Sequence, residues 1–176
     1  MTQARPQVAE AFEAFFEKHH AELSRLAFLV TGSSGTADEV AADALLATWT
    51  QWDRVCAADS PIAYVRRMVV NIGTSRVRRT IHERRLLPMM VADDDEDAPD
   101  LTTADVLDVR EALRALPPRR RACIVLRYGL DLSEEEVART LEISPGTVKS
   151  QTSKAAAQLR GLLGGRPRCA TTTGGT

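Results

Sequence analysis

The side chains that follow Pro145 have the chemistry needed to recognise duplex DNA. Lysines there can neutralise phosphates, while hydroxyl and amide groups can hydrogen-bond to base edges in the major groove. The set that helical spacing turns outward is Thr147, Lys149, Ser150, Gln151, Ser153 and Lys154. An ordinary solvated helix face is the alternative, and the flanking sequence favours DNA binding.

The stretch L-S-E-E-E-V-A-R-T-L-E-I-S-P-G-T-V-K-S predicts two helices joined by a tight turn. Ser133 and Glu136 have the spacing of a capping box, which starts a short helix. Ser144 and Pro145 cap and start a longer helix through Leu163. The apolar residues expected where the two helices meet are Val137, Ala138, Leu141, Ile143 and Val148. This pattern is typical of a helix-turn-helix.

A second set of side chains suits single-stranded or melting DNA. Ser60 and Pro61 start a helix through about His82, with a buried stripe formed by Ile62, Val65, Val69 and Ile72. The opposite stripe holds Tyr64, Arg67, Asn71, Thr74 or Ser75, and Arg78, and it is widened by Arg66, Arg76 and Arg79. Arginines can follow a backbone, an aromatic ring can stack on a base, and an amide can read its edge. Taken alone, the stripe also fits an ordinary amphipathic helix.

The remaining apolar periodicity predicts helices and no sheet, so the expected fold class is all-α. Residues 12–30 form an amphipathic helix, and Thr36 with Glu39 has capping-box spacing for a second helix through about Trp52. The inward residues expected on this second helix are Val40, Ala44, Leu45 and Trp49. Two further helices are expected over residues 104–115 and 118–128.

An acidic segment divides the helices into two small domains. Residues 88–101 hold D-D-D-E-D between two prolines, and this composition opposes packing. We therefore expect a helical domain at 8–87, a flexible acidic linker at 88–103, a helix-turn-helix domain at 104–163 and a disordered tail at 164–176.

Residue types and spacing argue against an enzyme, a cofactor or a metal site. Cys56, Cys123 and Cys169 are far apart and show no metal-ligand spacing. The T-G-S-S-G stretch lacks the lysine of a phosphate-binding loop, and the three histidines have no evident nucleophile or metal partner. The apolar runs are too short to cross a membrane and the N-terminus has no secretory pattern, so we expect a cytoplasmic protein.

Together the two motifs resemble the bacterial sigma factors of RNA polymerase. S-P-I-A-Y-V-R-R-M-V-V-N-I-G-T-S-R-V-R-R is similar to the region that binds and melts the minus-10 promoter element. The stretch from L-P-P-R-R-R to I-S-P-G-T-V-K-S is similar to region four, which reads the minus-35 element. Because the long middle domain of primary sigma factors is missing, the chain resembles the extracytoplasmic-function (ECF) group, in an actinobacterial style of composition.

The resemblance implies a non-enzymatic subunit that directs promoter recognition, DNA melting and transcription initiation at a specific set of promoters. It assigns minus-10 contacts to Tyr64, Arg66, Arg67, Asn71, Ser75, Arg78 and Arg79, and minus-35 contacts to the outward set after Pro145. The implied partners are promoter DNA, double-stranded and melted, and core RNA polymerase through its β′ clamp helices and β flap. An anti-sigma factor is a further partner to consider. The candidates for polymerase binding are Glu39, Asp43, Leu46 and Gln51.

Three features bear on how far the resemblance extends. Glu142 stands where the family commonly has a glycine with positive φ. A residue other than glycine costs about 1 kcal/mol there if the turn is unchanged. The second helix of the motif lacks the extra arginines of many relatives. The acidic linker is interpreted as a solvated tether, with mimicry of nucleic acid in the polymerase's RNA path as the alternative.

Two other functions would leave part of the sequence unexplained. A free-standing helix-turn-helix regulator accounts for the second motif and not for the first. A protein-interaction adaptor accounts for the first domain without any contact to melted DNA.

Overall fold

The chain folds into helices throughout the residues that its computed structural model describes, 4–86 and 104–164. The first half contains α1 (Ala4–Thr31), α2 (Ser34–Thr50), α3 (Trp52–Cys56) and α4 (Pro61–Leu86). The second half contains α5 (Ala104–Arg114), α6 (Pro118–Ile124), the π-helical turn η1 (Val125–Gly129), α7 (Glu134–Leu141) and α8 (Pro145–Gly164). The expected acidic linker, residues 165–176 of the expected tail and Cys169 lie outside the described residues, and Gly164, the first residue of that tail, ends α8.

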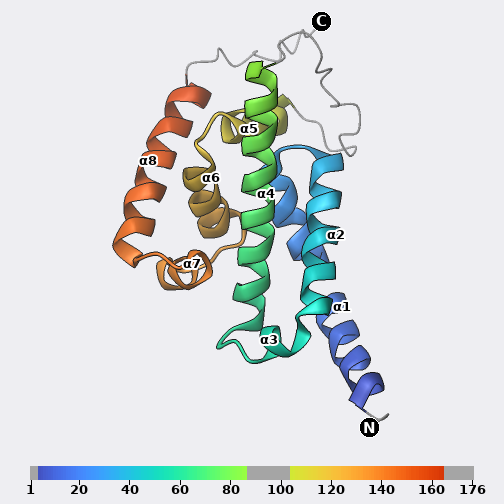
Figure 1. The fold of residues 1–176 in the computed structure, drawn as a ribbon. Helices are drawn as coiled ribbons and strands as arrows, with labels where there is room; N and C mark the ends of the chain where they lie inside the picture. The colour runs from blue at the N-terminus through green and yellow to red at the C-terminus, as the bar shows by residue number, and fades with distance from the viewer. Residues whose placement is uncertain (1–3, 87–103, 165–176) are drawn as a thin grey trace, which may run out of the picture.

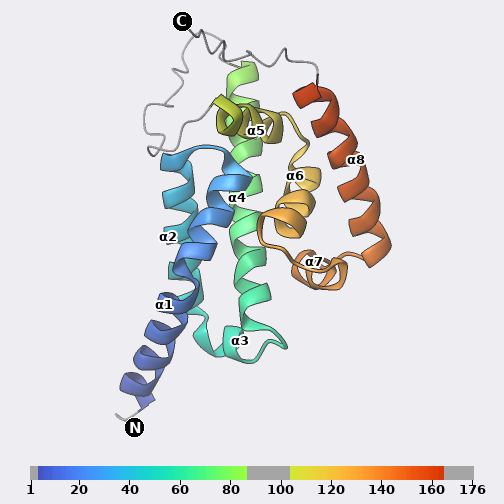
Figure 2. The same ribbon diagram turned by 180° about the vertical axis from the view of Figure 1, so that it is seen from behind.

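In the first half, α1, α2 and α4 lie side by side around an apolar core (Figures 1 and 2). The expected inward stripe of α4 is confirmed, since Val65 and Val69 are fully buried and Ile62 and Ile72 pack against them. Ser60 caps this helix by accepting a hydrogen bond from the Ala63 N–H at 3.4 Å. The all-α prediction is confirmed for the described residues. The first helix begins at Ala4, eight residues before the predicted start, and α3 was not predicted.

Two expectations for α2 were wrong. This helix begins at Ser34 with Ser33 as its N-cap, so Thr36 lies inside the first turn and forms no capping box. The chain has already turned at Gly32, where φ is +77°, and Ser33 is extended. The N-cap therefore lies three residues before the Thr36 that capping-box spacing indicated.

Trp49 was also predicted to face inward, and it is 43% exposed. The inward position on the last turn of α2 is held by Thr48, which is fully buried because its hydroxyl donates to the Ala44 carbonyl at 2.7 Å. The helix then breaks at Gln51, and Trp52 at the start of α3 packs against Phe15, with ring centroids 5.5 Å apart. Trp49 stays partly exposed, with its ring centroid 5.0 Å from that of Phe12, and Trp52 is the more buried of the two tryptophans.

In the second half, α6, η1, α7 and α8 pack against one another through apolar side chains. The predicted helix over 118–128 is α6 continued by η1, where the Leu130 N–H donates to the Val125 carbonyl at 3.2 Å. The helix-turn-helix core is confirmed, since Val137, Ala138 and Val148 are buried and Leu141 and Ile143 pack against the cluster.

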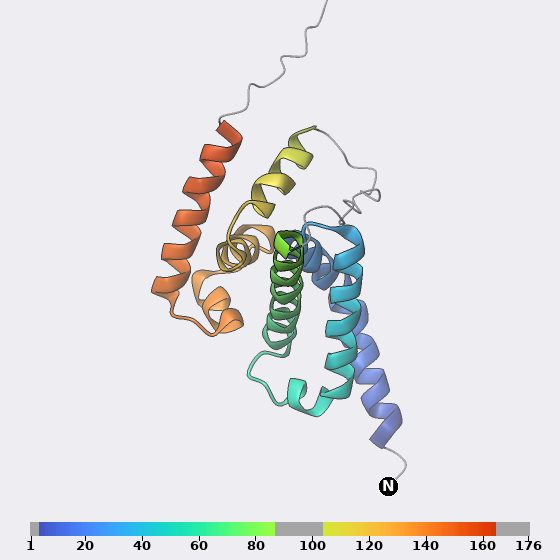
Figure 3. The same cartoon turned by 45° about the horizontal axis from the view of Figure 1, so that its top comes forward.

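The two halves pack against each other, and α4 lies between the α1–α2 pair and the helices of the second half (Figures 1 and 3). Their buried apolar residues form one cluster that continues from α1 and α4 into α6 and η1. At η1, Gly129 approaches Leu29 of α1 so closely that a Cβ would lie 3.0 Å from its Cδ1 atom.

Arg121, which has no carboxylate partner among the described residues, holds this boundary together. The Arg121 guanidinium is buried and donates to the Val30 carbonyl at 2.6 Å, to the Arg114 carbonyl at 2.6 Å and to the Leu116 carbonyl at 3.3 Å. Burial, with a smaller contribution from the nearby Arg114 charge, lowers the pKa of Arg121 to about 10, so the group remains charged at neutral pH. Nearby, Arg110 Nε donates to the Gly32 carbonyl at 2.8 Å.

Replacing Arg121 should therefore cost much more stability than replacing an exposed neighbour. We expect Arg121→Met to lower the free energy of unfolding by about 2–4 kcal/mol, because it leaves buried carbonyls without donors. Arg121→Lys should be intermediate, since an ammonium cannot reproduce the planar fork. Arg119→Met, on the exposed face of α6, is the matched control. Urea unfolding followed by circular dichroism measures the difference, and equal losses for Arg121→Met and Arg119→Met would contradict this role.

Candidate nucleic-acid interface

The turn between α7 and α8 is built by local hydrogen bonds. Ser133 Oγ accepts from the Glu136 N–H at 3.2 Å, and the Ser133 N–H donates to Glu136 Oε2 at 2.8 Å, so the predicted capping box is confirmed. The hydrogen bond from the Ser133 backbone N–H to the carboxylate, and then the Ser133 hydroxyl, hold the pKa of Glu136 below its ordinary value. At the start of α8, Ser144 Oγ accepts from the Thr147 N–H at 3.1 Å.

Glu142 ends α7 in the left-handed conformation, with φ 52° and ψ 47°. The turn therefore keeps the positive φ that glycine would adopt freely, in spite of a side chain that costs about 1 kcal/mol there. The Glu142 carboxylate forms an ion pair with Arg67 of α4, across the boundary between the two halves. Sequence reasoning recognised the unusual residue and missed its partner, which is 75 positions away in the chain.

The side chains predicted for duplex recognition lie along one side of α8. Val148, Thr152 and Ala155 are buried against the neighbouring helices, and they fix which way this helix faces. Gln151 is half-buried, and the exposed members of the predicted set are Thr147, Lys149, Ser150, Ser153 and Lys154.

The side chains predicted for melted DNA lie along α4, in two environments. Asn71, Ser75, Arg78 and Arg79 are exposed, and Tyr64, Arg66 and Arg67 are half-buried. The Arg67 guanidinium lies 5.1 Å from the Tyr64 ring centroid, a cation–π distance. Arg66 Nε forms an ion pair with Glu22 at 2.6 Å, and Arg79 pairs with Glu83 at 2.7 Å, so each of these arginines already has a carboxylate.

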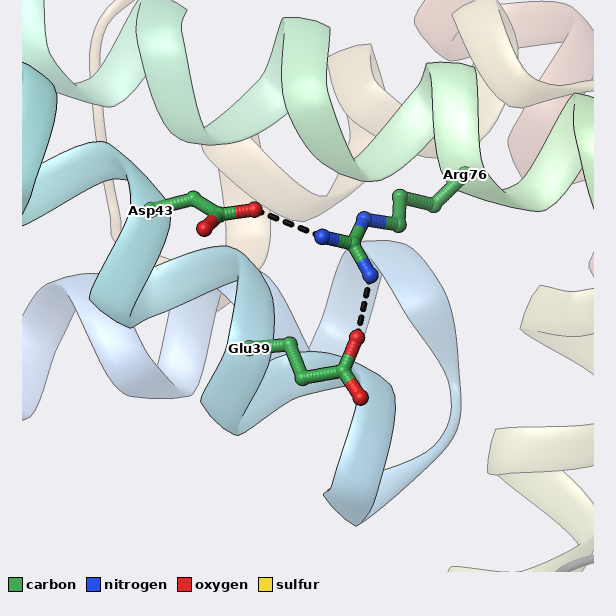
Figure 4. Close-up of polar contacts among 3 residues, drawn as sticks. All are labelled: Glu39, Asp43 and Arg76. Carbon is green, nitrogen blue, oxygen red and sulfur yellow. Dashed lines mark hydrogen bonds and ion pairs between the residues drawn. The ribbon is translucent and has the colours of Figure 1, made fainter.

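The residues predicted for polymerase binding all lie exposed at α2 and its C-terminal cap. Leu46 is 63% exposed, an unusual position for a large apolar side chain, and Gln51 caps the helix. Glu39 and Asp43 both pair with Arg76 of α4, the latter at 2.6 Å (Figure 4). Arg76 therefore points toward α2 and is held there by two carboxylates.

A cleft of about 470 Å³ lies where the two sets meet. From α4 it is lined by Asn71, Thr74, Ser75 and Arg78, and from the second half by Arg119, Cys123, Glu142, Thr147 and Gln151, among others. Both predicted DNA-binding surfaces thus border the same cleft. Sequence spacing showed each surface separately, and no pattern in the sequence indicated that they would face each other.

The family of the chain follows from comparison with known proteins. Sigma-70 region 2 matches residues 15–82, and Sigma-70, region 4 matches residues 107–159. The ECF RNA polymerase sigma factor SigM of Mycobacterium tuberculosis is 32% identical over 156 residues, which cover 88% of this chain and 78% of SigM. This chain belongs to the ECF sigma factors. It is therefore an RNA polymerase sigma factor that recognises promoters, with region 2 in its first half and region 4 in its second.

A second relative agrees with this assignment, and a solved structure shares the fold. The RNA polymerase sigma-E factor of Streptomyces avermitilis is 32% identical over 158 residues, covering 88% of this chain and 86% of that protein. The structure of the sigma factor RpoE in complex with the anti-sigma factor NepR, from Bartonella quintana, matches 90% of this chain and 99% of RpoE with a TM-score of 0.74. At 21% identity, that match shows a shared fold.

The described residues were also searched for metal-binding clusters and membrane-spanning helices. Within residues 4–86 and 104–164, no cluster of three or more histidine, cysteine or acidic side chains could hold a metal ion. None of the helices in those ranges is long and apolar enough to cross a membrane.

The capping box at the start of α7 should stabilise the protein, and the contribution of its Glu136 carboxylate should depend on pH. Ser133→Ala should lower the free energy of unfolding by about 1 kcal/mol, whereas Ser150→Ala, at an exposed position on α8, should change it little.

Because the folded-state pKa of Glu136 is lowered, the carboxylate stabilises the folded protein above the ordinary pKa of a glutamate, and this stabilisation is lost as the pH falls. Glu136→Gln should therefore destabilise the protein more at about pH 7 than at about pH 3. Urea unfolding at the two pH values measures this, and an equal loss would contradict a role for the carboxylate.

Proposed function

We propose that this sigma factor divides promoter recognition between the two surfaces that border the cleft. The polar stripe of α4 binds and melts the minus-10 element, through Tyr64, Arg67, Asn71, Ser75 and Arg78, with Arg66 and Arg79 beside them. The exposed face of α8 reads the minus-35 element through the set from Thr147 to Lys154. The observation that carries the proposal is that each set lies on a helix whose opposite side is buried, and that most of its members are exposed to solvent. The exposed members are Asn71, Ser75, Arg78 and Arg79 on α4, and all of the α8 set except Gln151.

The chemistry of each surface fits its element. On α4, an aromatic ring next to a guanidinium can stack on an unpaired base, and Asn71 offers both a donor and an acceptor to a base edge. On α8, Lys149 and Lys154 can contact phosphates while Ser150 and Gln151 reach into the major groove. Melting therefore depends on α4 and duplex recognition on α8.

Polymerase binding is proposed for the exposed part of α2. Leu46 offers an apolar contact to the β′ clamp helices, and Glu39, Asp43 and Gln51 surround it with polar groups. The β flap is proposed to contact α6 and its neighbours. The protein is proposed to be non-enzymatic, to need no cofactor, and to act in the cytoplasm as a subunit of the transcribing polymerase.

An anti-sigma factor is proposed as a further partner. The proteins of two matching structures, RpoE of Bartonella quintana and CnrH, are in complex with the anti-sigma factor NepR and with the cytosolic domain of CnrY, respectively. A purified candidate that binds this chain and blocks run-off transcription would support the partnership, and a candidate that binds without inhibiting would not.

Two substitutions should separate melting from polymerase binding. Asn71→Ala should weaken the open complex by about 1–3 kcal/mol, because it removes a base-edge contact, and should leave affinity for core polymerase unchanged. Leu46→Asp should weaken core binding by about 1.5–3 kcal/mol, because it removes an apolar contact. Permanganate reactivity of promoter thymines measures melting, and fluorescence anisotropy measures core binding.

Arg25→Ala, an exposed basic residue on α1 away from both surfaces, is the matched control for this pair. Unchanged melting with Asn71→Ala would favour the adaptor alternative for region 2. A protein that never directs run-off transcription with purified core polymerase would refute the division of promoter recognition proposed here.

The lysines of α8 should reveal phosphate contacts through salt dependence. Each phosphate contact contributes about −0.9 to the slope of log K against log salt for duplex DNA. Lys149→Ala and Lys154→Ala should each reduce the slope by about 1, and the effect should be similar for all promoter sequences. Gln151→Ala should instead relax sequence preference with little change in slope. Anisotropy titrations on minus-35 duplexes at several salt concentrations distinguish these outcomes, and an unaltered slope in both lysine variants would exclude phosphate contacts.

A further inference from the structure

We propose that Arg76 is a positioning residue for polymerase binding, whose guanidinium orients the Glu39 and Asp43 carboxylates of α2 and leaves one oxygen of each free for the polymerase. The inference rests on the function proposed above, because it takes the exposed part of α2 to be the polymerase-binding surface. Sequence spacing placed Arg76 beside the minus-10 stripe of α4, whereas its contacts direct it toward α2.

The Arg76 guanidinium bridges two carboxylates of the same helix (Figure 4). Its Nη1 atom donates to Glu39 Oε2, and its Nη2 atom donates to Asp43 Oδ2 at 2.6 Å. Two separate nitrogens are used, which is the planar fork that arginine offers and lysine lacks. Because Glu39 and Asp43 lie one helical turn apart, their charges repel each other, and a shared guanidinium offsets this repulsion.

Each carboxylate uses one oxygen for Arg76 and keeps the other available. Glu39 Oε1 and Asp43 Oδ1 have no hydrogen-bond or ion-pair partner among the described residues. The two side chains are 63% and 49% exposed, so a donor on a partner protein can approach them from solvent. A carboxylate can accept several hydrogen bonds at once. The bridge therefore presents two oriented acceptors on the surface of α2 without having to break when a donor arrives.

The backbone on both sides of the bridge is held by the core. On α2, Val40 and Ala44 directly follow the two acidic residues and are fully buried. On α4, Gly73 lies three residues before Arg76 and packs so closely against α1 that a Cβ would be 3.0 Å from Val30 Cγ1. With both helices fixed, the remaining freedom of the two carboxylates lies in their side-chain rotamers, which the bridge restricts.

Orienting the carboxylates in the free chain reduces the entropy that is lost on binding. Fixing one exposed, rotamer-rich side chain at an interface weakens binding by roughly two- to tenfold. Arg76 restricts Glu39 and Asp43 before the polymerase arrives. Its loss should therefore speed dissociation of the complex. Because removing a cation makes the surface of α2 more acidic, the same change should not slow association with a partner that donates to carboxylates.

The test measures binding of the full-length chain to immobilised core polymerase by biolayer interferometry. Arg76→Gln should raise the dissociation rate roughly three- to tenfold, with no fall in the association rate. Arg76→Lys keeps the charge and loses the planar fork, so its dissociation rate should be intermediate. Arg25→Gln, which removes an exposed arginine from α1, is the matched control and should bind like the parent.

A double-mutant cycle separates positioning from a general effect on the fold. In a Glu39→Gln, Asp43→Asn background, Arg76 has no carboxylate to orient, so adding Arg76→Gln should change the affinity for core polymerase little. A residue that acted only through the fold would weaken binding equally in both backgrounds. Equilibrium titration gives the affinity where dissociation is too fast to follow, and circular dichroism checks that the helices of each variant are intact.

Two results would overturn the proposal. One is an Arg76→Gln variant that dissociates at the parent rate or more slowly, since Arg76 would then be inert or would compete with the polymerase for the carboxylates. The other is an equal effect of Arg76→Gln in the two backgrounds. Failure of the α2 assignment itself looks different, because the Glu39→Gln, Asp43→Asn variant would then bind core polymerase like the parent.

Discussion

The arrangement of regions 2 and 4 depends on a buried charged group that is paired with no opposite charge in the part of the chain that the structure describes. The Arg121 guanidinium can stay in the interior because main-chain carbonyls from α1 and from the α5–α6 connection accept its hydrogen bonds. Carbonyls at the C-terminal end of a helix lack partners within the helix, so the end of α1 offers acceptors at this boundary. One side chain thereby satisfies the end of α1 and fixes α6 against it.

The local structure could be predicted from the sequence wherever a short-range rule governs it. The apolar stripe of α4, the Ser60 and Ser133 caps and the helix-turn-helix core follow from spacing and from donors a few residues away. The same reasoning failed at Thr36 and Trp49, where the start and the break of α2 depend on Gly32, Thr48 and Gln51. Spacing alone does not show which of two nearby residues will cap a helix, or which of two tryptophans will pack.

The boundary between the two regions could not be predicted in this way. The partners of Arg121 and Arg110 are main-chain atoms, which every residue has, so no side-chain type marks them in the sequence. Glu142 was recognisable as an unusual residue in a turn, but pairing it with Arg67 required knowing how α4 and α7 pack. The two surfaces that DNA chemistry suggested remain predictions, and their mutual orientation depends on these long-range contacts.

The use of main-chain acceptors at the boundary affects how the protein can change over evolution. A carbonyl persists through any substitution of its own side chain, so most positions at the end of α1 can vary without loosening Arg121. Compensating pairs of substitutions between α1 and α6 will consequently be scarce, even though the two helices touch. Gly32 is the exception, because a Cβ there would lie 2.6 Å from the Arg114 side chain. Comparative sequence methods that infer contacts from paired changes would therefore underestimate this interface.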